Sequence, residues 1–199
     1  MKNVLLLLAQ GFEAYEASVF TDVLGWSRDI GDNPVNVVTA GRRAQIQCTW
    51  NLIVTPEVQL PGISVDQYDA LAVPGGFEEA GFYEDAYHED FLKIIRRFHD
   101  ANKIIASICV GALPLGKSGI LKNKKATTYH LMDGKRRQQL ESFGACVQDQ
   151  PIVVDDSIIT STSPATALDV AFKLLRMLTS PDNEKKVKAA MGFLKEPGT

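Results

Sequence analysis

The chain has 199 residues, of which 45% are hydrophobic and 23% charged, and its 24 acidic and 21 basic residues give a formal net charge of −3. Because this length and composition suit a domain that folds without disulfides or a structural metal, we expect a single domain over residues 1–199. The near-neutral charge excludes the basic surface with which proteins bind nucleic acid or anionic lipid, and no apolar run is long enough to span a membrane.

The first part of the chain alternates between strand and helix patterns. The continuous apolar run Val4–Leu8 predicts a buried strand rather than a signal peptide, because the apolar core Val4–Ala9 is short and no cleavage pattern follows it. Apolar residues at helical spacing predict a helix at Glu16–Arg28. We then expect a strand at Val35–Thr39 and a hairpin or short strands at Arg43–Pro56.

The middle of the chain repeats the alternation of strands and helices. We expect a strand at Tyr68–Val73, which ends at a Pro-Gly-Gly turn, and a helix at Asp90–Asn102. A second continuous apolar run, Ile104–Ile108, predicts another buried strand. A short helix follows it, up to about Gly119.

The last part of the chain contains shorter strands and three predicted helices, of which the last begins at about residue 182. In chain order we expect a strand at Lys125–Thr128, a polar helix at Asp133–Phe143, strands at Ile152–Val154 and Ile158–Thr160, and helices at Ser163–Leu178 and Asn183–Met191.

Strands that alternate with helices predict an α/β fold, with a mostly parallel central sheet covered by helices on both faces. In such sheets, ligands bind where strands finish at their carboxyl ends. This rule directs attention to three junctions, after Leu8, after Val73 and after Ile108.

The strongest chemical signal is the segment Ala106–Ala112, in which a buried strand runs directly into a helix with Cys109 at the junction. This pattern is typical of a nucleophile elbow, a sharp turn that presents a reactive side chain above the sheet. A helix N-terminus favours the thiolate, so we expect Cys109 to be reactive toward electrophiles and oxidants. A buried and inert cysteine is the alternative interpretation.

The other two junctions carry glycines and acids. Gly75 and Gly76 follow the strand that ends at Val73, so their amides could approach a ligand closely, although a tight turn alone also explains the pair. Glu13 and Glu16 lie three residues apart at a helix start, where one of them could face the cysteine or both could simply favour the helix dipole.

The chain has three histidines, which are candidate partners for a reactive cysteine. We expect His88 and His99 at the surface, which leaves His130 as the reasonable partner for Cys109. No spacing typical of a zinc site or a phosphate-binding loop is present, so we expect neither a metal nor a cofactor.

The three cysteines are too few for a disulfide framework and indicate a reducing, cytoplasmic compartment. Cys48 lies in a strand-like stretch and could be exposed, whereas Cys146 follows a predicted helix and is expected to be packed.

Together these segments resemble the ThiJ/PfpI superfamily. The resemblance covers nearly the whole chain and is carried by the order and spacing of Val4–Glu16, Val73–Gly76, Ala106–Ala112 and Ile158–Thr166. It implies a flavodoxin-like three-layer sandwich, akin to class I glutamine amidotransferases, and a homodimer without a cofactor.

The resemblance also implies roles for individual residues. It identifies Cys109 as the nucleophile, Glu16 rather than Glu13 as the acid that contacts its sulfur, and Gly75 and Gly76 as an amide-lined pocket.

The chain differs from the family pattern at three places. In the peptidase-like branch a histidine follows the cysteine, whereas this chain has Val110, which argues against PfpI-type proteolysis. In the deglycase branch a histidine directly follows paired threonines, but here Tyr129 takes that place and His130 comes one residue later. The segment Ser163–Thr166 replaces a glycine-rich one.

The first hypothesis for function is a cysteine-dependent glyoxalase or deglycase that acts on small reactive carbonyls. Cys109 would add to an aldehyde, Glu16 would move protons with help from His130 or Tyr129, and the backbone near Gly76 and Val110 would hold the oxyanion. The alternatives are a redox sensor that works through oxidation of Cys109, a cysteine hydrolase or amidase of PfpI type, and a catalytically silent binding domain.

Overall fold

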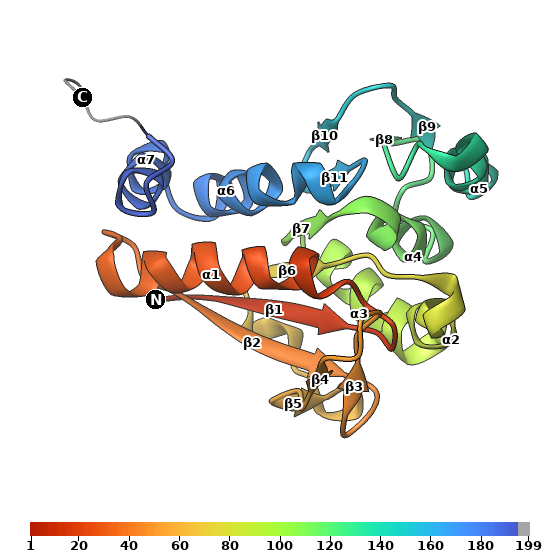
Figure 1. Cartoon of the computed structure of the whole chain (residues 1–199), viewed down its shortest axis with the longest axis horizontal. Coiled ribbons are helices and arrows are strands. Elements are labelled where there is room, and N and C mark those ends of the chain that lie inside the picture. Colours follow the sequence, from red (N-terminus) through yellow and green to blue (C-terminus); the bar gives the residue numbers. More distant parts are fainter. Residues whose placement is uncertain (195–199) are drawn as a thin grey trace.

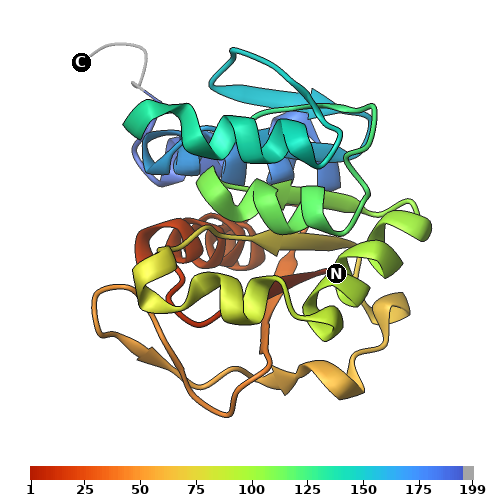
Figure 2. The ribbon, with the colours of Figure 1, turned by 90° about the vertical axis from the view of Figure 1, so that its right-hand side faces the viewer.

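The structure is a computed structural model that describes residues 1–194, and it is built around one seven-stranded sheet (Figure 1). The strands lie in the order β10-β11-β7-β6-β1-β2-β5, which Figure 2 shows as colours passing from blue at the top through green to orange at the bottom. They are β1 (Lys2–Leu8), β2 (Val35–Gly41), β5 (Val58–Gln59), β6 (Ala70–Val73), β7 (Ile104–Ser107), β10 (Ile152–Asp155) and β11 (Ile158–Ser161). Neighbours are parallel from β5 to β11, and β10 pairs antiparallel with β11.

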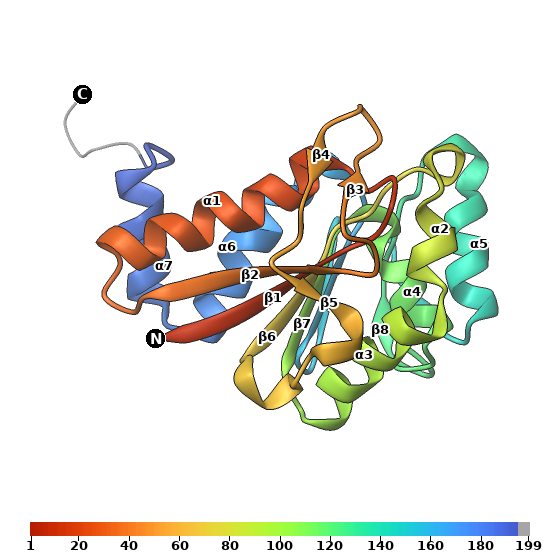
Figure 3. The same ribbon diagram turned by 90° about the horizontal axis from the view of Figure 1, so that it is seen from below.

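Helices cover both faces of this sheet, as the view in Figure 3 shows. One face carries α1 (Ala14–Ile30), α6 (Ala167–Leu178) and α7 (Pro181–Ala190). The other face carries α2 (Phe82–Ala86), α3 (Glu89–Asp100), α4 (Ala112–Lys117) and α5 (Lys135–Ser142). The three-layer α/β sandwich that the sequence predicts is therefore confirmed.

Short elements complete the fold around the edges of the sheet. β3 (Ile46–Gln47) and β4 (Ile53–Val54) form the antiparallel hairpin that the sequence predicts, and β8 (Lys125–Ala126) pairs in parallel with β9 (Cys146–Val147). The 3-10 turns are η1 (Leu60–Gly62), η2 (Val65–Gln67), η3 (Glu78–Ala80), η4 (Cys109–Gly111), η5 (Met132–Gly134) and η6 (Pro164–Thr166).

The central strands are buried on both faces, as their continuous apolar runs predict. Val4 and Leu5 of β1 are fully buried, and so are Ile105 and Ala106 of β7. Since side chains alternate between the two faces of a strand, burial of consecutive residues requires a helical layer on each side. The rigid centre of the molecule therefore positions the carboxyl ends of β1, β6 and β7 next to one another.

Some sequence predictions differ from the structure. The strand β5 and the helix α2 were not predicted, because elements of two and five residues are too short to show a period. The helix predicted from Ser163 begins only at Ala167, since Pro164–Thr166 forms a 3-10 turn. The expectation that Cys146 is packed is wrong: Cys146 lies in β9, outside the main sheet, and is exposed.

The buried side chain of Asn183 connects α7 to the end of α1 through hydrogen bonds. Its Oδ1 accepts a hydrogen bond of 2.7 Å from the Asp32 amide, and its Nδ2 donates to Ser27 Oγ at 3.0 Å and to Thr179 Oγ1 at 3.1 Å. Asn183 is 1% exposed, so these polar groups have no access to water as a substitute partner. The contact between the two helices therefore depends on this amide.

We predict that Asn183→Ala lowers the free energy of unfolding by about 2 kcal/mol, because several buried polar groups lose their partner. Urea unfolding measured by circular dichroism checks this value. Lys186→Ala is the matched control, since Lys186 lies on the same helix and pairs with the exposed Asp32 side chain. We expect the control to change the free energy by less than about 0.5 kcal/mol, and an equal loss in both variants would contradict this account.

Candidate functional site

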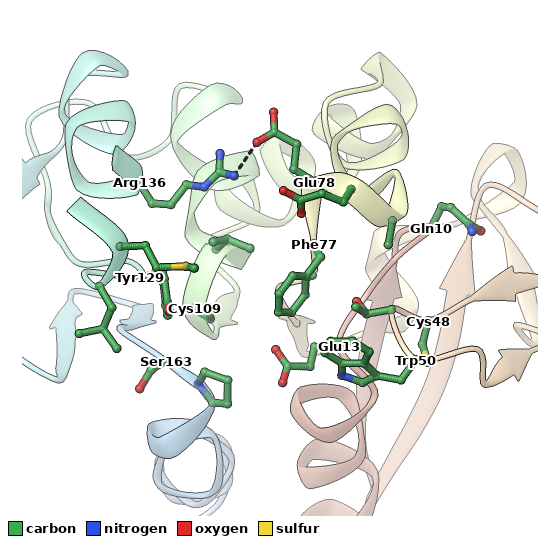
Figure 4. Close-up of a pocket in the computed structure, with 18 of the residues that line it drawn as sticks. Gln10, Glu13, Cys48, Trp50, Phe77, Glu78, Cys109, Tyr129, Arg136 and Ser163 are labelled. Atoms are coloured by element: carbon green, nitrogen blue, oxygen red, sulfur yellow. Dashed lines mark hydrogen bonds and ion pairs between the residues drawn. The ribbon is translucent and has the colours of Figure 1, made fainter. Parts of the chain in front are cut away.

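A cavity of ≈ 970 Å³ opens at the carboxyl ends of β1, β6 and β7. All three junctions that the sequence singled out contribute to its lining, through Glu13 after β1, Gly76 after β6 and Cys109 after β7. The remaining wall comes from the β3–β4 hairpin, the segment around Tyr129, Arg136 of α5, and η6 (Figure 4). The rule that ligands bind at the carboxyl edge of a parallel sheet thus leads directly to this cavity.

Cys109 occupies a sharp turn between β7 and α4. Its φ is 56°, in the left-handed region that non-glycine residues seldom adopt. The turn is held by a hydrogen bond of 2.9 Å from Thr128 Oγ1 to the Cys109 carbonyl oxygen. It also requires Gly111, because a Cβ at that position would lie 2.5 Å from the carbonyl oxygen of Val73. The strand–turn–helix arrangement of a nucleophile elbow is therefore present.

Glu16, on the first turn of α1, is completely buried. Its Oε2 accepts a hydrogen bond of 2.6 Å from the Gly75 amide, and the carboxyl interacts with the Cys109 side chain. Its Oε1 has no hydrogen-bond partner within residues 1–194. A buried carboxylate oxygen without a partner is costly, and a proton on the carboxyl relieves that cost.

The surroundings of Glu16 favour its protonated form. Burial, and then the negative charge of Glu13, raises the pKa of Glu16 to about 8, although the hydrogen bond from Gly75 acts in the opposite direction. An ordinary exposed glutamic acid has a pKa of about 4.3. Glu16 therefore carries its proton through most of the physiological pH range, next to the sulfur of Cys109.

The thiol of Cys109 experiences the same environment. Burial, followed by the negative charge of Glu16, raises the pKa of Cys109, whereas a hydrogen bond from the Val110 amide lowers it. The expectation that a helix N-terminus alone favours the thiolate is wrong here, because α4 has only six residues and burial outweighs its dipole. When Glu16 is protonated its charge disappears, so the thiolate forms more readily beside a neutral carboxyl.

The backbone amides of the two glycines in the Pro-Gly-Gly turn have different surroundings. The Gly75 amide is occupied by Glu16. The Gly76 amide has no hydrogen-bond partner in the described part of the chain, and Gly76 and Val110 both line the cavity. Gly76 is also required sterically, because a Cβ there would lie 2.3 Å from the carbonyl oxygen of Gly11. Of the two predicted amides, the one at Gly76 is therefore available to a ligand.

The structure separates His130 from the cavity. His130 is exposed and is not among the residues that line the cavity, whereas Tyr129 is half-buried and does line it. His88 is at the start of α3, where its Nδ1 accepts a hydrogen bond of 3.2 Å from the Asp90 amide, and His99 lies on the same helix. The structure thus brings together Glu16, Cys109, Gly76 and Val110, but not His130.

One side of the cavity has no counterpart among the residues that the sequence patterns single out. Trp50 and Phe77 line it, with ring centroids 5.4 Å apart in an edge-to-face arrangement. In Figure 4 these rings lie across the cavity from Tyr129 and Cys109. Cys48 also belongs to the lining and is buried, although the sequence left open that it could be exposed. The presence of Trp50 in the turn of a predicted hairpin was the available signal.

Within residues 1–194, no group of three or more His, Cys, Asp or Glu side chains is arranged to hold a metal ion. No helix in that part of the chain is long and apolar enough to cross a membrane.

The coupling between Glu16 and Cys109 predicts the effect of Glu16→Gln. Removing a buried negative charge beside the sulfur lowers the pKa of Cys109, so alkylation of Cys109 by iodoacetamide reaches its half-maximal rate at a lower pH than in the wild type. Peptide mass spectrometry measures this rate, and the exposed Cys146 in the same sample is the internal control. An unchanged or higher midpoint for Cys109 would contradict the coupling.

Two curated relatives match this chain over more than four fifths of their own length. The chain is 34% identical over 165 residues to the Schizosaccharomyces pombe protein named glutathione-independent glyoxalase DJ-1, covering 82% of this chain and 81% of the relative. It is 29% identical over 199 residues to Drosophila melanogaster protein DJ-1alpha, covering 98% of this chain and 86% of the relative.

A solved structure and a family model agree with these relatives. The crystal structure of Drosophila melanogaster DJ-1beta superposes with a TM-score of 0.83 at 24% identity, covering 98% of this chain and 99% of that one. The DJ-1/PfpI family model matches residues 2–177, nearly the whole described chain. The protein therefore belongs to the DJ-1/PfpI family.

Proposed function

We propose that this protein is a cysteine-dependent glyoxalase or deglycase that acts on small reactive carbonyls. The observation that carries the proposal is the buried Glu16 carboxyl, with its pKa raised to about 8, beside Cys109, which lines an open cavity. The name glutathione-independent glyoxalase, given to the Schizosaccharomyces pombe relative, supports the same activity.

The first step forms a covalent adduct with a 2-oxoaldehyde. The Cys109 thiolate adds to the aldehyde carbon, and the electron pair of the carbonyl moves to its oxygen. Glu16 donates its proton to that oxygen, so the product is a hemithioacetal and Glu16 becomes a carboxylate. We propose that the amides of Gly76 and Val110, two residues of the cavity lining, stabilise the negative charge on the oxygen while it develops.

The second step moves hydrogen within the adduct. Glu16 removes the proton from the former aldehyde carbon and delivers it to the neighbouring ketone oxygen, which gives an enediol. It then carries the other enediol proton to the second carbon, which gives a thioester. The first carbon is oxidised and the second is reduced, so no external oxidant or cofactor is needed.

Hydrolysis completes the cycle. A water molecule attacks the thioester carbon, Glu16 accepts a proton from that water, and the sulfur leaves as the Cys109 thiolate. The released product is a 2-hydroxy acid, and Glu16 ends the cycle protonated as it began. A group that both accepts and donates protons works best when its pKa lies near the working pH, which is the condition that burial creates for Glu16.

Tyr129 is the side chain that we propose as the assistant to Glu16, because its ring lines the cavity on the Cys109 side (Figure 4). The proposal gives no role to His130, which is exposed and lies outside the lining. A hydrolase or amidase of PfpI type is disfavoured for the same reason, since neither the residue after Cys109 nor His130 supplies a base in the cavity.

A redox sensor is the second candidate, and one specific observation favours it. The unpartnered Oε1 of Glu16, when protonated, is able to donate a hydrogen bond to an oxygen on an oxidised Cys109 sulfur. The two candidates use the same pair of residues and differ in whether turnover occurs.

We further propose a homodimer that works in the reducing cytoplasm. The family resemblance supports the dimer, and the exposed Leu52 and Ile53 of the hairpin and Trp26 of α1 are apolar groups that a partner surface could cover. Three free cysteines, with Cys109 needed as a thiol, support a reducing compartment.

We expect Cys109→Ala to lower the turnover of methylglyoxal at least ~100-fold, because the other thiol of the lining, Cys48, lies on the opposite side of the cavity (Figure 4) and does not contact Glu16. Consumption of methylglyoxal and formation of lactate measure this loss. Cys146→Ala is the matched control, since this thiol is exposed and outside the cavity, and we expect it to keep wild-type activity. Equal turnover by the wild type and Cys109→Ala would reject the proposed function.

Glu16→Gln separates thiol reactivity from catalysis. The variant should have a more acidic thiol, yet its turnover of methylglyoxal should fall about 100-fold, because an amide cannot move the protons of the enediol step. The two measurements are made on one preparation, so the alkylation rate also shows that the elbow is intact. A variant that gained turnover in parallel with thiol reactivity would show that Glu16 is only an electrostatic neighbour.

A further inference from the structure

The cavity is much larger than a three-carbon carbonyl requires. Its volume of ≈ 970 Å³ lies at the upper end of the range of about 300–1,000 Å³ that is typical of pockets for drug-sized ligands. With its carbonyl at Cys109, a methylglyoxal molecule would leave most of this space to water. The wall opposite Cys109 therefore determines which larger substrates fit.

That wall presents two aromatic rings to the solvent. Trp50 is 68% exposed and comes from the turn of the β3–β4 hairpin, and Phe77 is 39% exposed and follows β6. Their edge-to-face contact at 5.4 Å orients the two rings toward each other, and Figure 4 shows both on the side of the cavity that faces Cys109 and Tyr129. Exposed rings in a concave site gain free energy when an apolar group covers them, and stacked or edge-to-face contact adds to that gain.

The charged groups of the lining disfavour an anionic ligand. Three glutamates, Glu13, Glu78 and Glu79, line the cavity together with one basic residue, Arg136. The Arg136 guanidinium already donates a hydrogen bond of 2.7 Å to Glu78 (dashed in Figure 4) and lies 5.1 Å from the centre of the Tyr83 ring. Its charge is therefore matched within the protein, and a carboxylate or phosphate on a substrate would face the remaining acidic groups.

We propose that the site is selective for neutral 2-oxoaldehydes that carry an aromatic group, with the ring seated against Trp50 and Phe77 while the aldehyde carbon reaches Cys109. The reaction in this inference rests on the proposed glyoxalase function, but the binding preference of the cavity does not. The same acidic lining repels the 2-hydroxy acid anion that the reaction forms, which favours release of the product.

The relative turnover of an aromatic and an aliphatic 2-oxoaldehyde tests the role of the wall that Trp50 and Phe77 form. We expect kcat/KM for phenylglyoxal to exceed that for methylglyoxal by ~10-fold or more in the wild type, and the ratio to fall to about threefold or less in Trp50→Ala and in Phe77→Ala. Phe193→Ala is the matched control, because Phe193 is an exposed aromatic residue outside the cavity, and its ratio should equal that of the wild type. Comparing ratios between variants removes the difference in intrinsic reactivity of the two aldehydes. Unchanged ratios in both wall variants would overturn the proposal.

A binding experiment separates this inference from the proposed function. In full-length Cys109→Ala protein, we expect calorimetry to show mandelamide binding ~10-fold more tightly than lactamide, and this preference to disappear on adding Trp50→Ala. This binding preference does not depend on catalysis. If the wild type turned over neither aldehyde, that finding would reject the proposed function but not the aromatic binding site. Equal binding of the two amides would reject the aromatic site.

Binding of an anionic ligand, measured in the same way, tests the effect of the acidic lining. The anion mandelate should bind more weakly than the neutral mandelamide. Adding Glu78→Gln frees the Arg136 guanidinium, so we expect the affinity for mandelate to rise roughly fivefold while that for mandelamide stays constant. Mandelate that bound more tightly than mandelamide before this substitution would overturn the preference for neutral ligands.

Discussion

A carboxyl group buried without access to water is the constraint on which the rest of this site depends. Glu16 is on the first turns of α1, packed under the carboxyl edge of the sheet, and the Gly75 amide holds one of its oxygens. Burial makes the charged form of Glu16 costly, so the carboxyl keeps a proton near neutral pH. In the proposed reaction, Glu16 donates this proton to the substrate oxygen when the Cys109 sulfur adds to the aldehyde carbon.

The fold supplies that constraint through three adjacent strands. β1 leads into the helix that carries Glu16, β6 ends at the glycines, and β7 ends at the strained turn of Cys109. These strands are neighbours in the sheet, so residues that lie far apart in sequence meet at one edge. Glycine is required at positions 76 and 111, because a Cβ at either position would lie too close to backbone atoms of a neighbouring segment. Stability and chemistry therefore depend on the same close packing.

Much of this arrangement follows from local sequence patterns, and the rest does not. Continuous apolar runs predict β1 and β7, and the Ala106–Ala112 pattern predicts the elbow, because both depend on neighbours in the chain. Burial of Cys48, exposure of Cys146 and the pairing of Trp50 with Phe77 depend on contacts between distant segments. The raised pKa of Cys109 was missed for the same reason, since it comes from burial and from Glu16 rather than from the local helix.

The central claim is that Glu16 is protonated at neutral pH beside Cys109. The most direct test is a carbon-13 NMR titration of the side-chain carboxyl carbons in protein labelled at glutamate, with Glu16→Gln used to assign the signal. The account predicts that the Glu16 carboxyl titrates with a pKa of about 8. A Glu16 signal that titrates near the ordinary value of about 4.3 would contradict it.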